Sequence, residues 1–271
     1  MPSASPKADY TDGRRCDTLG FPVWKASLEC LLDEIAERIG EPPDCRTLYC
    51  LNPHSVVIAR RDPAFAGALV RASWLVPDGL GVLLAARLLA SDGGPRRRIT
   101  GSDVFLGLSS RLNERGDCRV FLLGSTPKTL GRMIERMATE WPRIGIAGTA
   151  SPPFKDAFSD DENEELVSAV NRSGSDVLWV GMTAPKQEIW IDRNQDRLGV
   201  SIACAVGAVF DFYAGTVQRP GVGAQRLGLE WAVRLSREPG RLWRRTLVST
   251  PLFVALVASA LLKHRLGGRT R

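Results

Sequence analysis

One carboxylate, Asp78, stands where an α/β protein could do acid–base chemistry. It follows an apolar strand and precedes Gly79-Leu80-Gly81, where a helix is predicted to begin. Ligands of open α/β sheets bind at the carboxyl ends of the strands. Asp78 is therefore a candidate general base, a role worth about 10²–10⁴-fold in rate. The alternative is that Asp78 caps the following helix, and the local sequence leaves both roles open.

A second strand-to-helix turn could hold a phosphate. The apolar strand that ends at Gly124 is followed by Ser125-Thr126-Pro127-Lys128, and the free N–H groups of a helix N-terminus bind anions. The segment lacks the second glycine and the Gly-Lys-Ser/Thr ending of a P-loop. It therefore favours a phosphate-bearing ligand without indicating a particular nucleotide, and an ordinary turn is the alternative.

Two further polar segments follow predicted strands later in the chain. Gln187 and Glu188 lie in the first turn of a predicted helix, where they could hold the hydroxyls of a sugar, although Glu188 could simply favour the helix dipole. Asp211 lies between two phenylalanines, close to the small residues around Gly207, where a backbone can approach a ligand. We expect Asp211 to be a structural acceptor more than a ligand contact.

Residue counts and spacing disfavour several kinds of site. The six cysteines form no Cys-x-x-Cys pair and there are two histidines, so we predict no metal centre. The sequence has no Asp-x-Asp pair to hold a divalent ion on a nucleotide diphosphate. Arg, Lys and helix N-termini would therefore have to stabilise the negative charge of a leaving group. Leu84 occupies the last position of a would-be Gly-x-Gly-x-x-Gly motif, which disfavours a nicotinamide cofactor.

The elements that would position these residues alternate along the chain. Short apolar runs separated by helical patterns indicate a mostly parallel sheet covered on both faces. The predicted fold class is therefore α/β, a Rossmann-like sheet with helices on both faces and a helical, membrane-associating C-terminal appendage. Strands are expected over 46–51, 74–76, 119–123, 144–147, 176–180 and 200–206. Helices are expected over 24–39, 63–72, 81–89, 103–115, 127–141, 160–172 and 185–196.

The net charge of +6 is concentrated at the end of the chain. Residues 226–271 hold ten Lys or Arg against two Asp or Glu, a local charge of +8. A protein that wraps duplex DNA should instead carry its positive charge on the groove-facing domain, so we expect no nucleic-acid partner.

The mainly apolar run 247–262 has cations on both sides. It is slightly short for a membrane span of roughly 20 residues, so we expect an interfacial helix or hairpin on anionic lipid. The alternative is a helix packed on its own domain.

Three segments follow from these patterns. Residues 1–20 are polar, have no apolar signal-peptide core, and are expected to form a disordered leader. Residues 21–225 form the α/β domain, and residues 226–271 form the basic, apolar appendage. We expect a cytoplasmic protein that associates with the inner face of the plasma membrane.

Six or more ordered blocks resemble those of the WecG/TagA/CpsF family of bacterial glycosyltransferases. The resemblance runs from about Gly20 to Arg245, and no single block would suffice. The blocks are Leu51-Asn52-Pro53, Pro77-Asp78-Gly79-Leu80-Gly81, Arg98-Ile-Thr-Gly101-Ser-Asp103, Leu123-Gly124, Ala184-Pro185-Lys186-Gln187-Glu188-Ile-Trp190, Gly207-Ala-Val-Phe210-Asp211-Phe212-Tyr-Ala-Gly215, Gly228-Leu229-Glu230-Trp231, Arg234-Leu235, Glu238-Pro239 and Arg241-Leu242.

This resemblance implies an inverting, metal-independent transfer from a UDP-sugar to a polyprenyl-diphosphate-linked saccharide, in exopolysaccharide or other cell-surface polysaccharide synthesis. The family's proposed base corresponds to Asp78. Arg234 and Arg241 match arginines expected to face the lipid diphosphate and close the site at an anionic membrane surface. The other substrate-binding candidates are Asn52, Cys50, Gly79, Arg98, Asp103, Gly124, Gln187, Glu188 and Asp211.

Cys50 departs from the family pattern, which usually has Thr two residues before Asn52. A thiol is a weaker hydrogen-bond partner than a hydroxyl, so this change bears on one substrate contact and on sugar choice.

Two alternatives to a transferase are kept. An oxidoreductase or methyltransferase would bind NAD or S-adenosylmethionine in place of UDP, and a membrane-tethered scaffold would gain no thermal stability from nucleotide.

Overall fold

The structure, a computed structural model, describes residues 13–40, 44–90, 93–155, 157–218, 221 and 247–267, with side chains as far as Lys263 in the last segment. The strands are β1 (Arg15–Thr18), β2 (Phe21–Trp24), β3 (Arg46–Leu51), β4 (Trp74–Pro77), β5 (Arg119–Gly124), β6 (Gly145–Ala150), β7 (Val177–Gly181) and β8 (Ile202–Ala205). The helices are α1 (Leu28–Glu37), α2 (Pro53–Ala59), α3 (Pro63–Arg71), α4 (Leu80–Leu89), α5 (Gly101–Arg115), α6 (Pro127–Glu140), α7 (Asp160–Ser173), α8 (Lys186–Asn194), α9 (Val209–Tyr213) and α13 (Ser249–Gly267), with a 3-10 turn at Gln195–Arg197.

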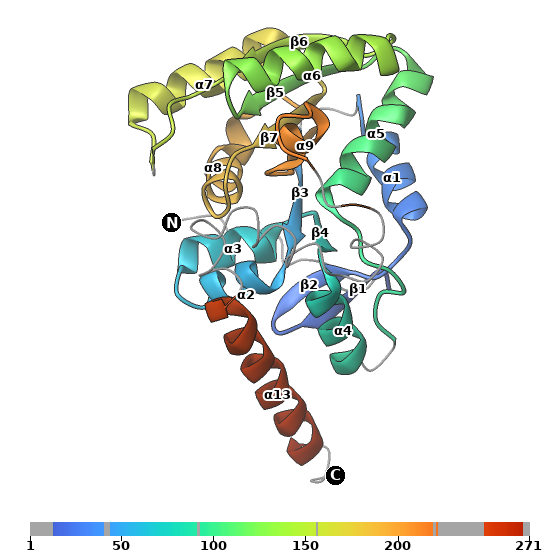
Figure 1. Ribbon diagram of the computed structural model, residues 1–271, viewed down its shortest axis with the longest axis vertical. Helices are drawn as coiled ribbons and strands as arrows, with labels where there is room; N and C mark the ends of the chain where they lie inside the picture. The colour runs from blue at the N-terminus through green and yellow to red at the C-terminus, as the bar shows by residue number, and fades with distance from the viewer. Residues whose placement is uncertain are drawn as a thin grey trace.

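The strands form one sheet in the order β1-β2-β4-β3-β8-β7-β5-β6 (Figure 1). Among these strands β1 and β2 pair antiparallel, and every other pairing is parallel. The central strands are short apolar runs buried along their length, as in Val177–Val180, which is the pattern of a parallel sheet covered on both faces. The predicted α/β class is confirmed.

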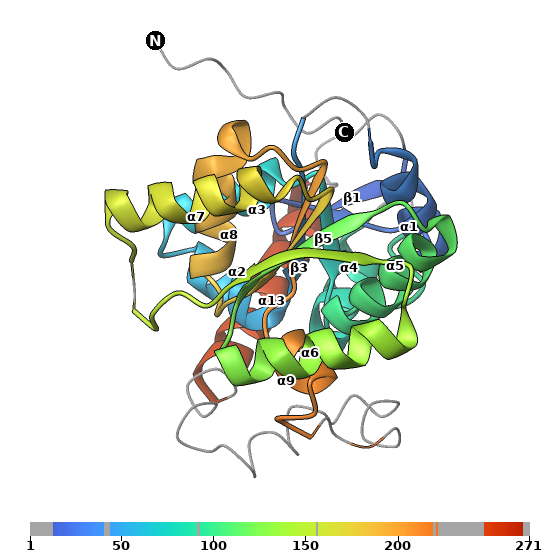
Figure 2. The same ribbon diagram turned by 90° about the horizontal axis from the view of Figure 1, so that it is seen from above.

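Side chains of alternate strand residues enter two separate cores. Leu51 and Leu75 pack with α2, α3, α7 and α8 in what we call the α8 core. Leu48 and Val76 pack with α1, α5, α6 and α9 in the α5 core. Seen from above, these two groups of helices lie on opposite sides of the sheet (Figure 2). The two-residue period of a strand therefore supplies both cores from one sheet.

Several short elements differ from the sequence predictions. Arg15–Thr18 lie inside the expected disordered leader but form β1, and Phe21–Trp24 form β2, whose last residue was expected to begin the first helix. Helices α2 and α9 were not predicted. Elements of four to seven residues show too few periods for their pattern to be recognised, and β2 depends on its pairing with the distant β4.

The C-terminal run forms one helix, α13, rather than a hairpin. Pro251 lies in its first turn, where a missing N–H group does not break a helix. Phe253 is 4% exposed, and His54 Nδ1 of α2 lies 2.8 Å from Ser249 Oγ. The helix therefore packs on its own domain through its first turns. The predicted boundary at 225/226 lies outside the described residues.

Membrane-crossing potential can be assessed for the helices that the structure describes. None of them combines the length and the hydropathy that a transmembrane span requires.

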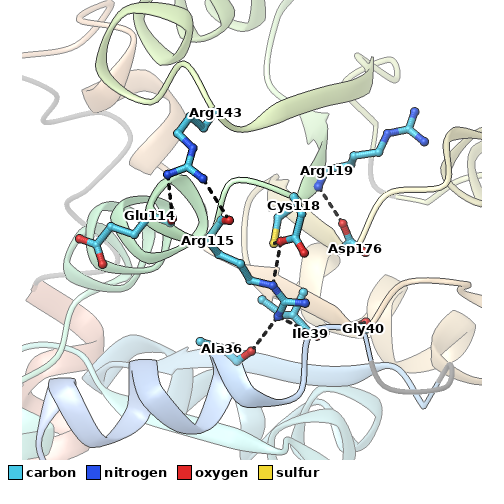
Figure 3. A network of polar contacts seen from close by, with 11 residues as sticks. Ala36, Ile39, Gly40, Glu114, Arg115, Cys118, Arg119, Arg143 and Asp176 are labelled. Carbon is cyan, nitrogen blue, oxygen red and sulfur yellow. Dashed lines mark hydrogen bonds and ion pairs between the residues drawn. The ribbon is translucent and has the colours of Figure 1, made fainter.

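Arginines cap helix ends at the edge of the sheet where β3 and β5 begin (Figure 3). The Arg115 guanidinium donates to the carbonyl oxygens of Ile39, just beyond α1, and Ala36, in its last turn, at 2.9 and 3.4 Å. Arg143 donates to the carbonyl oxygens of Glu114 and Arg115 at 2.9 and 3.4 Å, at the end of α5. Cations satisfy carbonyl groups that a helix C-terminus leaves without partners. The two arginines therefore help to hold the ends of α1 and α5 beside the amino ends of the strands.

The outer strand β6 carries an irregularity. Val120 of β5 pairs with Ile146, but the next residue, Phe121, pairs with Gly148, so one residue of β6 is skipped. Such a bulge bends the strand locally and increases its twist.

Phe105 is the centre of an aromatic cluster in the α5 core, which makes it a test of the packing. It is fully buried and its ring centroid lies 4.9 Å from that of Trp179 and 5.0 Å from that of Tyr213. Phe105→Ala should lower the free energy of unfolding by about 3–5 kcal/mol because it leaves a cavity. Urea denaturation measures this loss.

The matched control for that substitution is Phe154, which is 98% exposed. Phe154→Ala should change stability by less than about 0.5 kcal/mol. Equal losses in the two variants would show that the core is not packed as described.

Candidate active site at the carboxyl ends of the strands

Parallel pairing brings the carboxyl ends of β4, β3, β8, β7 and β5 to the same end of the sheet, which we call the sheet edge. Leu51, at the end of β3, pairs with Pro77, at the end of β4. The N–H group of Asp78 donates to the carbonyl oxygen of Leu51 at 2.8 Å. Asn52 and Asp78 therefore leave the sheet side by side, and β8, β7 and β5 end in order beyond them.

Asp78 is not the N-cap of α4. Gly79 occupies that position, with φ of +93°, and α4 has no side-chain cap. Positive φ favours glycine, which explains why Gly79 follows the acid. The helix-capping alternative for Asp78 is therefore wrong, and its half-buried carboxyl group stands at the sheet edge.

The block from Arg98 to Asp103 is held against the end of β4. The N–H group of Ile99 donates to the carbonyl oxygen of Pro77 at 3.0 Å. Asp103 Oδ2 accepts hydrogen bonds from Thr100 N and Thr100 Oγ1, both at 2.8 Å, in a capping box at the start of α5. Asp103 thus stabilises its own helix, and the bond from Ile99 holds the backbone next to the half-buried Arg98 at the end of β4.

Gly101 allows the start of α5 to approach the strand ends, which the sequence analysis did not recognise. A Cβ atom at Gly101 would lie 3.3 Å from the carbonyl oxygen of Val206 and 3.4 Å from Cys50 Sγ. The available signal was a glycine immediately after the Thr of a capping box, but the neighbours that require glycine are far away in the sequence.

Three carboxylates act on the Cys50 thiol. Burial raises its pKa well above the ordinary value, and the negative charges of Asp78, Glu188 and Asp103 raise it further. The thiol is therefore neutral at physiological pH. Asp78, Glu188 and Asp103 are thus all near enough to this sulfur atom for their charges to reach it.

Gln187 and Glu188 lie deeper than the sequence suggested. They are 4% and 2% exposed, and Gln187 Nε2 donates to Glu188 Oε1 at 2.8 Å. None of the described residues donates to Gln187 Oε1. A Cβ atom at Gly207, where φ is +59°, would lie 3.7 Å from the Gln187 amide nitrogen. A buried acceptor without a donor costs about 1–3 kcal/mol, which a hydroxyl of a ligand could recover.

The turn after β5 offers fewer amides than the sequence predicted. The N–H group of Ser125 donates to the carbonyl oxygen of Gly181 at 3.1 Å, Pro127 has no N–H group, and that of Thr129 donates to the N-cap side chain. Gly124 has φ of +115°, and a Cβ atom there would lie 2.6 Å from the Gly181 oxygen. Glycine is required at this position for the contact with β7.

Asp211 holds this turn in place. Its Oδ1 accepts hydrogen bonds from Ser125 Oγ at 3.2 Å and from Thr129 Oγ1 and Thr216 Oγ1 at 3.5 Å. These hydrogen bonds give Asp211 a structural part at this turn. Its carboxylate also places negative charge beside the turn, which disfavours a phosphate there.

Other predicted features can be placed only in part. Within the described ranges, no three His, Cys, Asp or Glu side chains are arranged to hold a metal ion. Arg234 and Arg241 lie outside the described residues. The structure therefore brings together Cys50, Asn52, Asp78, Gly79, Arg98, Asp103, Gln187 and Glu188, and it places Gly124 and Asp211 at the neighbouring turn.

Comparisons with known proteins support the resemblance that the sequence blocks indicate. Residues 16–267 match the Glycosyl transferase WecG/TagA/CpsF family. The chain is 32% identical over 214 residues to the N-acetylglucosaminyldiphosphoundecaprenol N-acetyl-beta-D-mannosaminyltransferase of Bacillus spizizenii, an alignment that covers 79% of this chain and 77% of that protein. It is 27% identical over 237 residues to the protein of the same name from Bacillus subtilis, which covers 88% of each.

The Gly124 turn can be tested by adding one methyl group. Gly124→Ala should lower the free energy of unfolding by about 1–3 kcal/mol, because φ is positive and the Gly181 carbonyl group blocks the Cβ position. Gly131→Ala is the matched control, since nothing lies within 4 Å of that Cβ position, and it should be neutral or stabilise by up to about 1 kcal/mol. Equal effects in thermal or urea unfolding would contradict the geometry.

The raised pKa of Cys50 predicts its alkylation behaviour. A thiol with a raised pKa stays protonated at the pH where an ordinary cysteine, with a pKa of 9.0, ionises, so its rate of reaction with iodoacetamide should keep rising well above pH 9. Mass spectrometry of labelled peptides measures the rate, with protein unfolded in urea as the control. A rate that levels off at the same pH as in the unfolded protein would mean that the fold does not raise the pKa of this thiol.

Proposed function

Because the chain belongs to the WecG/TagA/CpsF family of glycosyltransferases, we propose that it moves a sugar from a UDP-sugar to a polyprenyl-diphosphate-linked saccharide, with inversion and without a metal ion. Family membership makes the chain a glycosyltransferase and sets aside the oxidoreductase, methyltransferase and scaffold alternatives. The names of the two relatives describe transfer to a diphosphoundecaprenol-linked N-acetylglucosamine, which supports this class of acceptor.

The observation that carries the proposal is the position of Asp78. Its backbone is fixed to the end of β3 by the hydrogen bond to Leu51, Gly79 takes over the capping position, and its negative charge reaches the Cys50 thiol, as do those of Glu188 and Asp103. A base must be held rigidly within reach of the proton that it removes. Asp78 meets the requirement for rigidity at the edge where α/β enzymes bind ligands.

In the proposed reaction, Asp78 removes the proton of the acceptor hydroxyl group. The acceptor oxygen forms a bond to the anomeric carbon of the donor on the face opposite UDP. The bond between that carbon and the diphosphate oxygen breaks, and UDP leaves with the electron pair. A single displacement of this kind inverts the configuration at the anomeric carbon.

The donor would be held by the groups beside Asp78. We assign the unpartnered Oε1 of the buried Gln187 to a donor hydroxyl, and Arg98 to the charge on the departing diphosphate. Asn52 Oδ1 accepts the N–H group of Ser55 at 3.0 Å, so its amide nitrogen is the group that would donate to substrate. Gly124 would line the donor site through its backbone.

The appendage would connect this site to the membrane. We propose that in residues 226–271, which pack on the domain through the first turns of α13, Arg234 and Arg241 face the lipid diphosphate. The cations of this segment would meet anionic lipid at the inner face of the plasma membrane. The product would serve exopolysaccharide or related cell-surface polysaccharide synthesis.

Asp78→Asn tests the base. Transfer from a panel of UDP-sugars, UDP-N-acetylmannosamine included, to a diphospholipid acceptor should fall by about 10²–10⁴-fold while the thermal unfolding curve stays nearly unchanged. Asp33→Asn, on the distant α1, should keep wild-type turnover. Wild-type turnover in Asp78→Asn would refute the assignment, and NMR of the product would refute inversion if the donor's anomeric configuration were retained.

Removal of residues 226–271 tests the appendage. The shortened chain should bind anionic vesicles less well and should lose activity on a long polyprenyl acceptor, since the acceptor lipid stays in the bilayer. Vesicle cosedimentation and product formation measure the two effects. Vesicle binding as strong as that of the full chain would contradict the role of this segment.

A further inference from the structure

Helix α4 presents a row of leucines to solvent. Leu80, Leu84 and Leu88 are 39%, 53% and 61% exposed, and residues four apart lie on the same face of a helix. The opposite side of α4 is buried through Val82 and Ala86. An exposed contiguous row of large apolar side chains marks an interaction site more often than chance exposure does.

This leucine row adjoins the outer face of α13. Gly81 of α4 meets Phe253, since a Cβ atom at Gly81 would lie 3.4 Å from the Phe253 ring. Leu88 follows Gly81 by seven residues and so lies on the same side of α4. On α13, Leu252, Val254 and Leu262 are exposed. Both helices stand in the lower part of the molecule in Figure 1 and meet at Gly81 and Phe253, so the exposed leucines of α4 lie close to α13.

Several cations lie near this surface. Arg87 is the one charged residue of α4, and its guanidinium donates to the carbonyl oxygen of Pro95 at 2.9 Å. Arg96 and Arg97 are exposed in the same loop, and the exposed Lys263 follows Leu262 on α13. Between Ser249 and Leu262 the sequence contains no charged residue.

We propose that the leucine row of α4 is a bilayer-docking surface of the catalytic domain, continuous with the outer face of α13. The leucines enter the acyl boundary and the bordering cations meet anionic headgroups. A symmetric pair of copies fits less well, because an interface that uses the same patch twice would bring Arg87, Arg96 and Arg97 close to their own equivalents.

The surface also fixes how the site faces the membrane. Leu80 lies two residues after Asp78, at the first turn of α4, so insertion of the row would place the strand ends at the headgroup level. This part of the inference rests on the proposed function, since a lipid-linked acceptor requires such an orientation. The binding surface itself does not require it.

The test is the full-length double variant Leu84→Gln/Leu88→Gln. Its affinity for phosphatidylcholine vesicles that contain phosphatidylglycerol should fall by about tenfold or more, which corresponds to about 1.4 kcal/mol. Leu106→Gln is the matched control, because Leu106 is an exposed leucine on α5, and its vesicle affinity should equal that of wild type. Leu84→Phe/Leu88→Phe should restore binding.

Two outcomes would overturn the proposal. One is vesicle affinity in the glutamine variant equal to that of Leu106→Gln. The other is a wild-type dimer that the glutamine variant converts to a monomer in light scattering, which would make the surface a contact between copies.

Activity separates this proposal from the proposed function. The glutamine variant should transfer sugar to a short-chain, water-soluble diphosphate acceptor at the wild-type rate and should lose activity on the long-chain acceptor in vesicles. A different result would separate the two proposals: the glutamine variant loses vesicle binding, but neither it nor the wild-type protein transfers sugar to any acceptor. That result would support the docking surface and would refute only the transferase mechanism.

Discussion

The shared direction of β3, β4, β8, β7 and β5 is the constraint on which the site depends. Each strand is held to its neighbours by backbone hydrogen bonds, so the residues that follow the strands are placed without help from their own side chains. The bond from Asp78 to Leu51 is the last step of that ladder. A slip of one residue in β3 against β4 would move the side chains of β3 to the opposite faces of the sheet and would separate Cys50 from Asp78.

The two edges of the sheet use their polar groups differently. Where β3 and β5 begin, Arg115 and Arg143 satisfy carbonyl groups at the ends of α1 and α5. At the carboxyl ends of the strands, the Gln187 oxygen finds no donor among the described residues. The unsatisfied polar group thus lies where a ligand would bind, and the rest of the fold has to offset its cost.

The sequence predicted what depends on local pattern. Buried runs such as Val177–Val180 and the long helices α5, α6 and α7 were found near their observed bounds, because each spans enough residues to show its period. The position of Asp78 after a strand, and the structural part of Asp211, could also be read locally.

Contacts between distant segments were beyond the reach of local pattern. The turn at Gly124 was expected to cradle phosphate, but Gly181 and Asp211 occupy its groups. Asp103 was expected at substrate, but its carboxylate caps α5. The burial of Gln187 and the close approach of Gly101 likewise depend on neighbours that only the folded chain supplies.

The bulge between β5 and β6 has a consequence for the chain in crowded surroundings. An edge strand with free N–H and C=O groups invites another chain to extend the sheet, which is a common start of aggregation. Here the shift after Val120 disturbs the regular spacing of those groups along β6, and the other outer strand, β1, has four residues. Neither border is a good template for a further strand, so many copies gathered on one surface would remain separate molecules.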